Sequence, residues 1–359
     1  MYEKELFIDS RRISINDEPY FIADVGANHD GSLDRAFKLI ELAKESGADA
    51  VKFQNFIADK IVSKYGFENL EGNSTHQSNW KKSVFDTYID ASLSREWTIP
   101  IVEKCREIEI TYFTSPYDFD SVDHVESYLD AYKIGSGDVN WLEILEYIAK
   151  KDKTVLLATG AASLDDVKRA VDTILSFNKK LCLMQCNTNY TVDHDKSRHA
   201  NLNVLKTFAD LYPGIVLGLS DHSMNPATVI ASIPLGARVF EKHFTDDKKR
   251  EGPDHKFAVN PKEWKEMVFL AKEAFYALGD GIKKVEENEV ESRIVQQRCL
   301  RASRNILKGE IFTRDMVEVL RPCPDDAFRP WEINKIIGKK ASIDIEFGDA
   351  LRGSSIDDK

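Results

Sequence analysis

Short apolar segments that end in polar side chains recur along the first two thirds of the chain. The first spans residues 20–29 and carries Asp24 near its end. A segment with apolar residues at helical spacing follows at residues 32–46, and a second apolar run at residues 48–53 contains Lys52. This order predicts a strand–helix–strand unit. Its polar residues are expected at the carboxyl ends of parallel strands, where such folds carry their chemistry.

The same alternation predicts eight strands. The six further strands are expected at residues 111–114, 131–136, 154–159, 180–185, 215–219 and 237–242. Amphipathic segments such as 164–175 and 264–278 separate them and predict helices. Eight strand–helix repeats over about 260 residues predict an α/β fold of the (β/α)8 TIM-barrel type, with a doubly wound sheet as the alternative.

Flanking segments complete the predicted architecture. Alternating apolar residues before residue 17 predict a hairpin that closes the bottom of the barrel. Residues 58–93 are rich in polar and aromatic side chains and predict a long functional loop, followed by a helix from Ser94 to about residue 107. After the predicted barrel the apolar runs become short and are separated by residues typical of turns. We therefore assign three parts: a barrel domain at residues 1–281, a charged linker at 282–294 and a small second domain at 295–359.

Composition narrows the class of protein. The 359 residues carry a net charge of −11, which argues against nucleic acid or an anionic membrane surface as a partner. A hydrophobic fraction of 42% supports a large core, and no apolar run is long enough to span a bilayer. The N-terminus lacks the features of a signal peptide, so we expect a soluble, cytoplasmic protein. The five cysteines form no CxxC pair and are expected to be reduced, with Cys186 near a strand end.

Two lysines are candidates for binding an anion. Lys52 and Lys133 each lie within an apolar strand, and Thr114 and Ser136 follow nearby strands as hydroxyl donors, with Thr159 as a further candidate. Ammonium groups and hydroxyls together suit a phosphate. The alternative for each lysine alone is an ion pair with an acid at the surface, where charged residues are usually found.

Two histidines are candidates for binding a metal ion. His222 and His243 follow consecutive predicted strands, so a barrel would make them neighbours. Two neutral imidazoles, completed by water or substrate oxygens, form an open site for a divalent metal. The alternative for each is a hydrogen-bonded structural histidine. Asp254 lies in a loop that could fold over the barrel mouth or could instead cap a turn.

Several separated motifs, in this order along the chain, resemble the sialic acid synthase family. They lie at residues 22–31, 47–54, 132–137, 218–222, 241–244 and 252–255. The segment 308–313 and the Arg321-Pro322 pair resemble the antifreeze-like (SAF) domain that follows the barrel in that family. The resemblance covers nearly the whole chain from residue 20.

The resemblance implies a function and a set of roles. Members of the family condense phosphoenolpyruvate with an N-acylated hexosamine, giving a nine-carbon 2-keto sugar acid and phosphate. A divalent metal, usually Mn²⁺ with Mg²⁺ or Co²⁺ as alternatives, would bind His222 and His243. The remaining implied roles are phosphoenolpyruvate binding by Lys52, Lys133, Ser136 and Thr114, sugar binding by Gln54, Thr188, Tyr190 and Asp254, and catalysis by Asp24 and Asp138 together with the two lysines. Arg321 would reach the N-acyl group from the partner subunit of a domain-swapped homodimer.

This chain departs from the family pattern at several positions. Asp24 and Asp138 stand where Glu is more common, which shortens each carboxylate by one methylene, and Gln185 and Cys323 replace His and Gly. The acceptor stays open between N-acetylmannosamine, a 2,4-diacetamido-trideoxyhexose and a 6-phosphorylated sugar. Two other functions also stay open. One is a related condensation that makes an eight- or seven-carbon keto acid, and the other is a carbohydrate-binding protein without catalysis.

Overall fold

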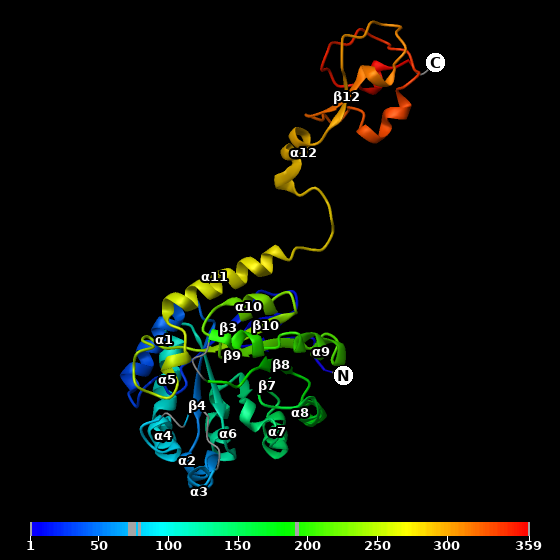
Figure 1. The fold of residues 1–359 in the computed structure, drawn as a ribbon. Coiled ribbons are helices and arrows are strands. Elements are labelled where there is room, and N and C mark those ends of the chain that lie inside the picture. The colour runs from blue at the N-terminus through cyan, green and yellow to red at the C-terminus, as the bar shows by residue number, and fades with distance from the viewer. Residues whose placement is uncertain (1, 71–76, 78–79, 191–193, 358–359) are drawn as a thin grey trace. The chain divides into compact units, whose positions relative to one another are not determined.

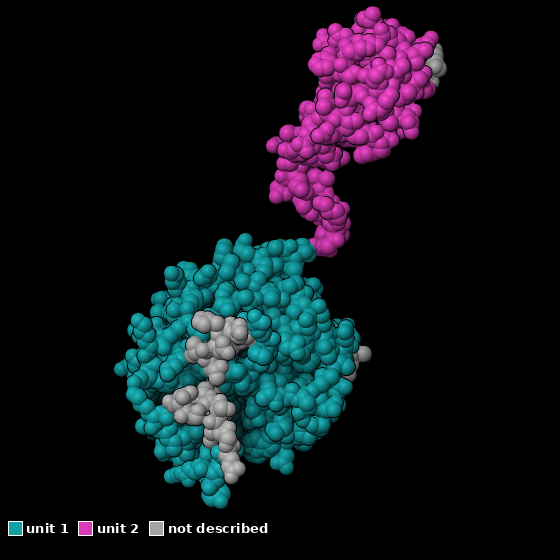
Figure 2. Space-filling model, viewed as in Figure 1, with its two compact units in different colours: residues 1–279 teal, residues 280–359 magenta. Residues whose placement is uncertain are grey.

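The computed structural model describes residues 2–70, 77, 80–190 and 194–357. The chain divides into two compact units, Met1–Gly279 and Asp280–Lys359, coloured separately in Figure 2. Within the described residues, no helix is both long and apolar enough to cross a membrane.

Eight parallel strands form the sheet of unit 1 (Figure 1). They are β3 (Tyr20–Asp24), β4 (Ala50–Asn55), β5 (Thr111–Pro116), β6 (Ala131–Ile134), β7 (Thr154–Ala158), β8 (Leu181–Cys186), β9 (Val216–Asp221) and β10 (Ala237–His243). Strand β3 pairs with β4 on one side and with β10 on the other, so the first strand of the series meets the last. Strands β5 and β6 lie side by side without a hydrogen-bonded ladder. The predicted TIM barrel is therefore confirmed as a nearly closed barrel, and the doubly wound alternative is excluded.

Helices surround the strands of the barrel in Figure 1. They are α1 (Leu33–Glu45), α5 (Thr98–Glu107), α6 (Phe119–Val125), α7 (Leu142–Ala149), α8 (Leu164–Phe177), α9 (Val204–Leu211), α10 (Ala227–Ser232) and α11 (Pro261–Ala277). Helix α1 begins where the Ser32 side chain accepts a hydrogen bond from the Arg35 amide. It buries one stripe of apolar residues, including Leu39 and Ile40, against the strands.

The N-terminal hairpin closes the barrel at the amino ends of the strands. Its strands β1 (Glu5–Ile8) and β2 (Arg11–Ser14) are antiparallel, as predicted. Leu6, Ile8 and Ile13 are buried in one cluster with strand residues such as Tyr20 and Phe113. Because this end is filled with apolar side chains, the polar chemistry is confined to the opposite end.

The segment predicted as a long loop contains short helices instead. They are α2 (Ala58–Ile61), α3 (Lys64–Glu68) and α4 (Val84–Ala91). Ser63 and Ser83 begin the last two, since each side chain accepts a hydrogen bond from an amide of the first turn. The helix predicted from Ser94 begins with a 3-10 turn, η2 (Arg95–Trp97), before α5, and the Ser94 side chain makes no capping bond.

Unit 2 has its own small core. The antiparallel strands β11 (Cys299–Ala302) and β12 (Val317–Leu320) and several 3-10 turns enclose a buried apolar cluster that includes Leu300, Phe312 and Leu351. A short helix, α12 (Val290–Gln296), precedes them. Arg321 is exposed and forms a cis peptide bond with Pro322.

Candidate active site

A pocket of about 360 Å³ opens among the carboxyl ends of the barrel strands. Most of the residues selected from the sequence line it: Asp24, Lys52, Gln54, Lys133, Ser136, Asp138, Thr188, Tyr190, His222, His243 and Asp254. They come from six different strands or the loops that follow them. Residues far apart in the sequence thus share one cavity.

Three buried ion pairs, formed by two lysines and two carboxylates, make the floor of this pocket. The Lys52 ammonium lies 2.9 Å from Asp24 Oδ2 and 3.5 Å from Glu241 Oε1, and Lys133 donates to the same Glu241 oxygen at 3.1 Å. Both lysines are only 2% exposed, which excludes the surface ion pairs considered above. Burial opposes the charge of Lys52, but Asp24 and Glu241 outweigh it and raise the pKa of its ammonium group. The floor therefore holds two cations and two anions within one hydrogen-bonded group.

Glu241 was not selected from the sequence, although it connects the two lysines. Successive side chains of a strand point to opposite faces, so Glu241 and His243 of β10 face the barrel interior together. Lys242, between them, points the other way, where its ammonium donates to Asp221 Oδ2 at 2.5 Å. Glu241 could have been identified from the sequence, because it lies two residues before His243 in the same strand and therefore shares its face.

The same alternation corrects the prediction for Thr114. The Thr114 hydroxyl donates to Asn55 Oδ1 at 2.6 Å and lies outside the pocket. Strand β5 continues to Pro116, and its next residue, Ser115, pairs with Gln54 and accepts a hydrogen bond from Lys52 at 3.5 Å. Ser115 is therefore the hydroxyl of β5 that faces the lysines.

The two histidines meet beside the ion-pair group. The ring centres of His222 and His243 are 5.5 Å apart. His222 Nδ1 lies 3.0 Å from the Asn187 carbonyl, which fixes the direction of that ring. His243 Nδ1 is buried without a hydrogen-bond partner among the described residues, and His243 Nε2 lies 3.6 Å from Asp24 Oδ2. Burial lowers the pKa of His243 to about 3, so its imidazole is neutral.

This arrangement fits a divalent metal ion. The neutral form of imidazole is the form that binds metal ions, and the buried Nδ1 of His243 has no hydrogen-bond partner among the described residues. The His222 ring is close enough to bind the same ion. The described residues hold no group of three or more His, Cys, Asp or Glu side chains arranged to hold a metal. The protein would thus supply two nitrogen donors and leave the other positions to water or substrate.

The loops at the mouth are positioned by specific contacts. Asp254 Oδ2 accepts a hydrogen bond from the Ala27 amide at 2.9 Å, which ties the last loop of the barrel to the first. Gly26 adopts a φ of +50°, and a Cβ atom there would lie 2.6 Å from Asp254 Oδ2 and 3.2 Å from His243 Nδ1. Only glycine leaves room for both groups.

Polar and aromatic groups complete the wall. Ser136 and Asp138 form a 3-10 turn, η4 (Ser136–Asp138), after β6, and the Ser136 hydroxyl accepts a hydrogen bond from the Gly160 amide at 3.0 Å. Burial raises the pKa of Asp138 to about 6. Tyr190 packs edge-on against the His222 ring at 4.5 Å. Further aromatic side chains line the pocket: Phe67, Trp80 and Tyr88, which belong to the aromatic-rich segment predicted to be functional, and Tyr117, which was not predicted.

Three other predicted or variant positions lie elsewhere. Arg321 and Cys323 belong to unit 2. Gln185 donates to the Ala200 carbonyl at 3.0 Å and does not line the pocket. Replacing the more common histidine by Gln185 therefore changes a contact between β8 and a loop rather than the pocket surface.

Known protein families match almost all of the chain. A model of the NeuB family matches residues 39–283, and a model of the SAF domain matches residues 297–357. The boundary between these matches lies close to the division between the two compact units.

Individual relatives match over most of their length. The chain is 36% identical over 323 residues to the spore coat polysaccharide biosynthesis protein SpsE of Bacillus subtilis, covering 85% of this chain and 84% of that protein. The crystal structure of SpsE aligns over 99% of both chains with a TM-score of 0.66 and 32% identity. A pseudaminic acid synthase of Campylobacter jejuni is 34% identical, covering 93% and 96%. An N,N'-diacetyllegionaminic acid synthase of Legionella pneumophila is 32% identical, covering 92% and 93%.

Proposed function

Because this chain belongs to the NeuB family, we propose that it is a nonulosonic acid synthase, which condenses phosphoenolpyruvate with an N-acylated hexosamine. The products are a nine-carbon 2-keto sugar acid and inorganic phosphate. The observation that carries the proposal is the group formed by Lys52, Lys133 and Glu241 beside the His222–His243 pair.

Phosphoenolpyruvate binds at the two lysines. Lys52 and Lys133 meet at one Glu241 oxygen, so their ammonium groups face a common point. A phosphate or carboxylate placed there gains charge-assisted hydrogen bonds from both. Ser136 adds a hydroxyl that lines the pocket, and the Ser115 hydroxyl accepts a hydrogen bond from Lys52. The buried setting strengthens these interactions because little water competes for them.

The two histidines would hold a divalent ion, and Mn²⁺ suits imidazole and oxygen ligands together. Such an ion polarises a carbonyl oxygen as a Lewis acid, which would activate the aldehyde of the open-chain sugar. His222 is held by Asn187, and His243 is held in its neutral form by burial. Asp24 lies 3.6 Å from His243 and 3.2 Å from Gln54 Nε2, so it positions both the ligand ring and a sugar-binding amide.

In the proposed reaction, water adds at C2 of the intermediate formed from phosphoenolpyruvate and the sugar, and Asp138 accepts a proton from this water. Its carboxylate lines the pocket and forms no side-chain hydrogen bond or ion pair with the described residues. A pKa of about 6 makes it a stronger base than an ordinary aspartate while it is still mostly ionised at neutral pH. Lys52 and Lys133 stabilise the negative charge of the departing phosphate.

The acceptor is an unphosphorylated sugar, and we favour a 2,4-diacetamido-trideoxyhexose. Among the described residues, Lys52 and Lys133 are the only lysine or arginine side chains that line the pocket, so a second phosphate would find no further cation. The aromatic side chains at the mouth suit a sugar with few hydroxyls. Gln54, Thr188, Tyr190 and Asp254 would contact the sugar, and Arg321 would reach its N-acyl group from the partner subunit of a domain-swapped homodimer.

The test measures phosphate released from phosphoenolpyruvate by the purified protein with Mn²⁺. The acceptors are N-acetylmannosamine, its 6-phosphate and 2,4-diacetamido-trideoxyhexoses, and mass spectrometry identifies the product. We expect turnover with an unphosphorylated acceptor and its loss in His222→Ala and His243→Ala. His199→Ala is the matched control, since His199 is exposed and outside the pocket. Absence of phosphate release with every hexosamine would refute the assignment.

A further inference from the structure

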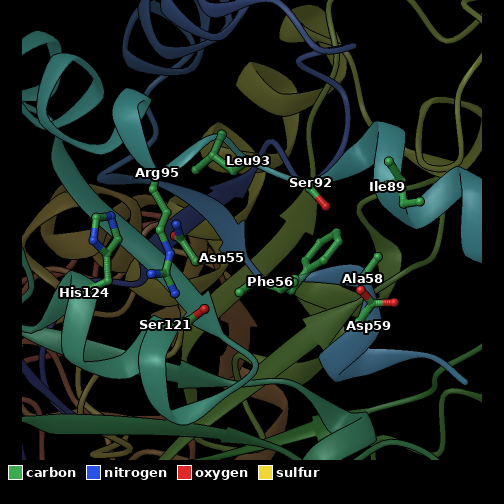
Figure 3. Close-up of a pocket in the computed structure, with 11 residues that line it drawn as sticks. Asn55, Phe56, Ala58, Asp59, Ile89, Ser92, Leu93, Arg95, Ser121 and His124 are labelled. Carbon is green, nitrogen blue, oxygen red and sulfur yellow. The ribbon is translucent and has the colours of Figure 1, made fainter.

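A second pocket of about 510 Å³ lies outside the barrel interior, where β4 ends (Figure 3). Residues from β4, α2, α4, η2 and α6 and from the segments next to them line it. It shares one lining residue, Phe56, with the pocket described above. None of the residues assigned to the reaction lines it.

Two hydrogen-bond donors line this pocket without a side-chain partner among the described residues. Asn55 is only 3% exposed, and its Oδ1 accepts from Thr114, so its Nδ2 is the end without a hydrogen bond to any described residue. Arg95 is exposed and lines the same pocket, and its side chain forms no ion pair or hydrogen bond with the described residues. In Figure 3 the Arg95 guanidinium extends toward Asn55 and Ser121. Because two donors cannot satisfy one another, the space between them suits an acceptor.

The surrounding groups define the ligand. A guanidinium binds a carboxylate through two parallel hydrogen bonds, and the Asn55 amide adds a third donor. Phe56, Ile89 and Leu93 form apolar walls. The Asp59 carboxylate lies on the opposite side from Arg95 in Figure 3 and disfavours a second negative charge on the ligand. We infer that this pocket binds a small monocarboxylate whose remaining part is apolar, uncharged or cationic, and that its occupancy is coupled to the active-site pocket through Phe56.

The coupling follows from ring contacts. The Phe56 ring lies 5.4 Å from the ring of Tyr88 and 6.1 Å from that of Tyr117. Both tyrosines line the active-site pocket. A ligand against Phe56 therefore acts on two side chains of the proposed sugar site. This part of the inference rests on the proposed function, and its expected effect is on the KM for the sugar rather than on kcat.

Binding is measured first, because it does not depend on the reaction. Isothermal titration uses acetate, pyruvate, benzoate, N-acetylneuraminate and inorganic phosphate, each in the presence of saturating phosphoenolpyruvate to occupy the lysines of the larger pocket. We expect at least one carboxylate to bind. Arg95→Ala should weaken it by about tenfold or more, the size expected for losing a charged hydrogen-bond partner. Asn55→Asp, which replaces the donor by a carboxylate of the same shape, should abolish it.

Arg106→Ala is the matched control, because Arg106 is an exposed arginine on α5 outside the pocket. Its variant should bind like the wild type. Arg95→Ala should also keep the wild-type kcat and KM when no effector is added. If no carboxylate binds, or if binding is equal in the wild type and Arg95→Ala, the site does not exist. Binding of phosphate alone would refute the carboxylate assignment. Binding without any change in the KM for the sugar would refute the coupling, whereas absence of turnover in every variant would count only against the proposed function.

Discussion

Replacing Lys242 by methionine should destabilise the barrel strongly, although Lys242 does not face the active-site pocket. Its ammonium donates to Asp221 Oδ2 at 2.5 Å, to the Ser223 carbonyl at 2.5 Å and to the Ser223 hydroxyl at 3.2 Å. Burial alone would raise the pKa of Asp221, but Lys242 and the hydrogen bonds from Thr228 and Ser223 lower it. Asp221 is therefore charged in the folded protein. Methionine is an unbranched side chain one atom shorter than lysine, and it leaves the Asp221 charge without its cation.

The magnitude follows from the burial of both groups. Removing one partner of a buried ion pair costs about 3–5 kcal/mol, because the other charge stays buried and unpaired. An unfolding entropy of about 2.1 cal/mol/K per residue amounts to about 0.6 kcal/mol/K over the residues of unit 1. The expected fall in Tm is therefore about 5–9 °C. The double variant Asp221→Asn/Lys242→Met removes both charges and should recover much of this loss.

Differential scanning calorimetry of the barrel transition measures these shifts at neutral pH. Lys150→Met is the matched control, since Lys150 forms an exposed ion pair with Glu146 that contributes little. The pH dependence gives a second check. A lowered folded-state pKa of Asp221 contributes stability above the ordinary aspartate pKa of about 4, which is lost as pH falls through the lower folded-state pKa. A Tm for Lys242→Met within about 1 °C of the wild type would contradict the reasoning, as would a double variant less stable than Lys242→Met.

Three further predictions concern the pocket. Because burial raises the pKa of Asp138 to about 6, kcat/KM should rise with pH up to about 6 as Asp138 loses its proton, and Asp138→Asn should remove this rise. The raised pKa also means that folding favours protonated Asp138. Its contribution to the stability of the folded state is therefore present below about pH 4 and is lost as the pH rises to about 6. Gly26→Ala forces a Cβ atom to within 2.6 Å of Asp254 Oδ2 at a left-handed φ, so the KM for the sugar should rise at least tenfold, measured by phosphate release. Glu241→Gln removes the anion that Lys133 contacts, so phosphoenolpyruvate should raise the Tm of this variant more than that of the wild type in a thermal-shift titration.

The sequence predicted the strands and several pocket residues where a polar side chain occurs near the end of an apolar run. Apolar runs located all eight strands, and Lys52, Lys133, His222 and His243 stood out because charged or imidazole groups are unusual within such runs. The barrel topology then brought them together, since parallel strands all end at one face.

The sequence failed where the side-chain direction depended on the register of a strand. The run predicted at residues 111–114 continues to residue 116 in β5, so Ser115 and not Thr114 faces the interior. Glu241 was hidden because an acid next to a lysine in sequence suggests an exposed pair, whereas in β10 the two point to opposite faces. The sequence could not relate Arg95 to Asn55, because their shared pocket arises where α2, α4, η2 and α6 meet the end of β4.

Side chains near the strand ends point alternately into and out of the barrel, and this explains how the barrel can bury several charged groups close together. At the ends of β9 and β10 three side chains face the interior: His222, which directly follows β9, and Glu241 and His243 of β10. Asp221 of β9 and Lys242 of β10 face the exterior. The exterior ion pair joins the two strands at the level of the histidines. It can be stable in the apolar layer because Ser223 and Thr228 satisfy the remaining oxygens of Asp221. The interior groups are then left to bind ligands, since the contacts that hold the two strand ends together are made on the other face.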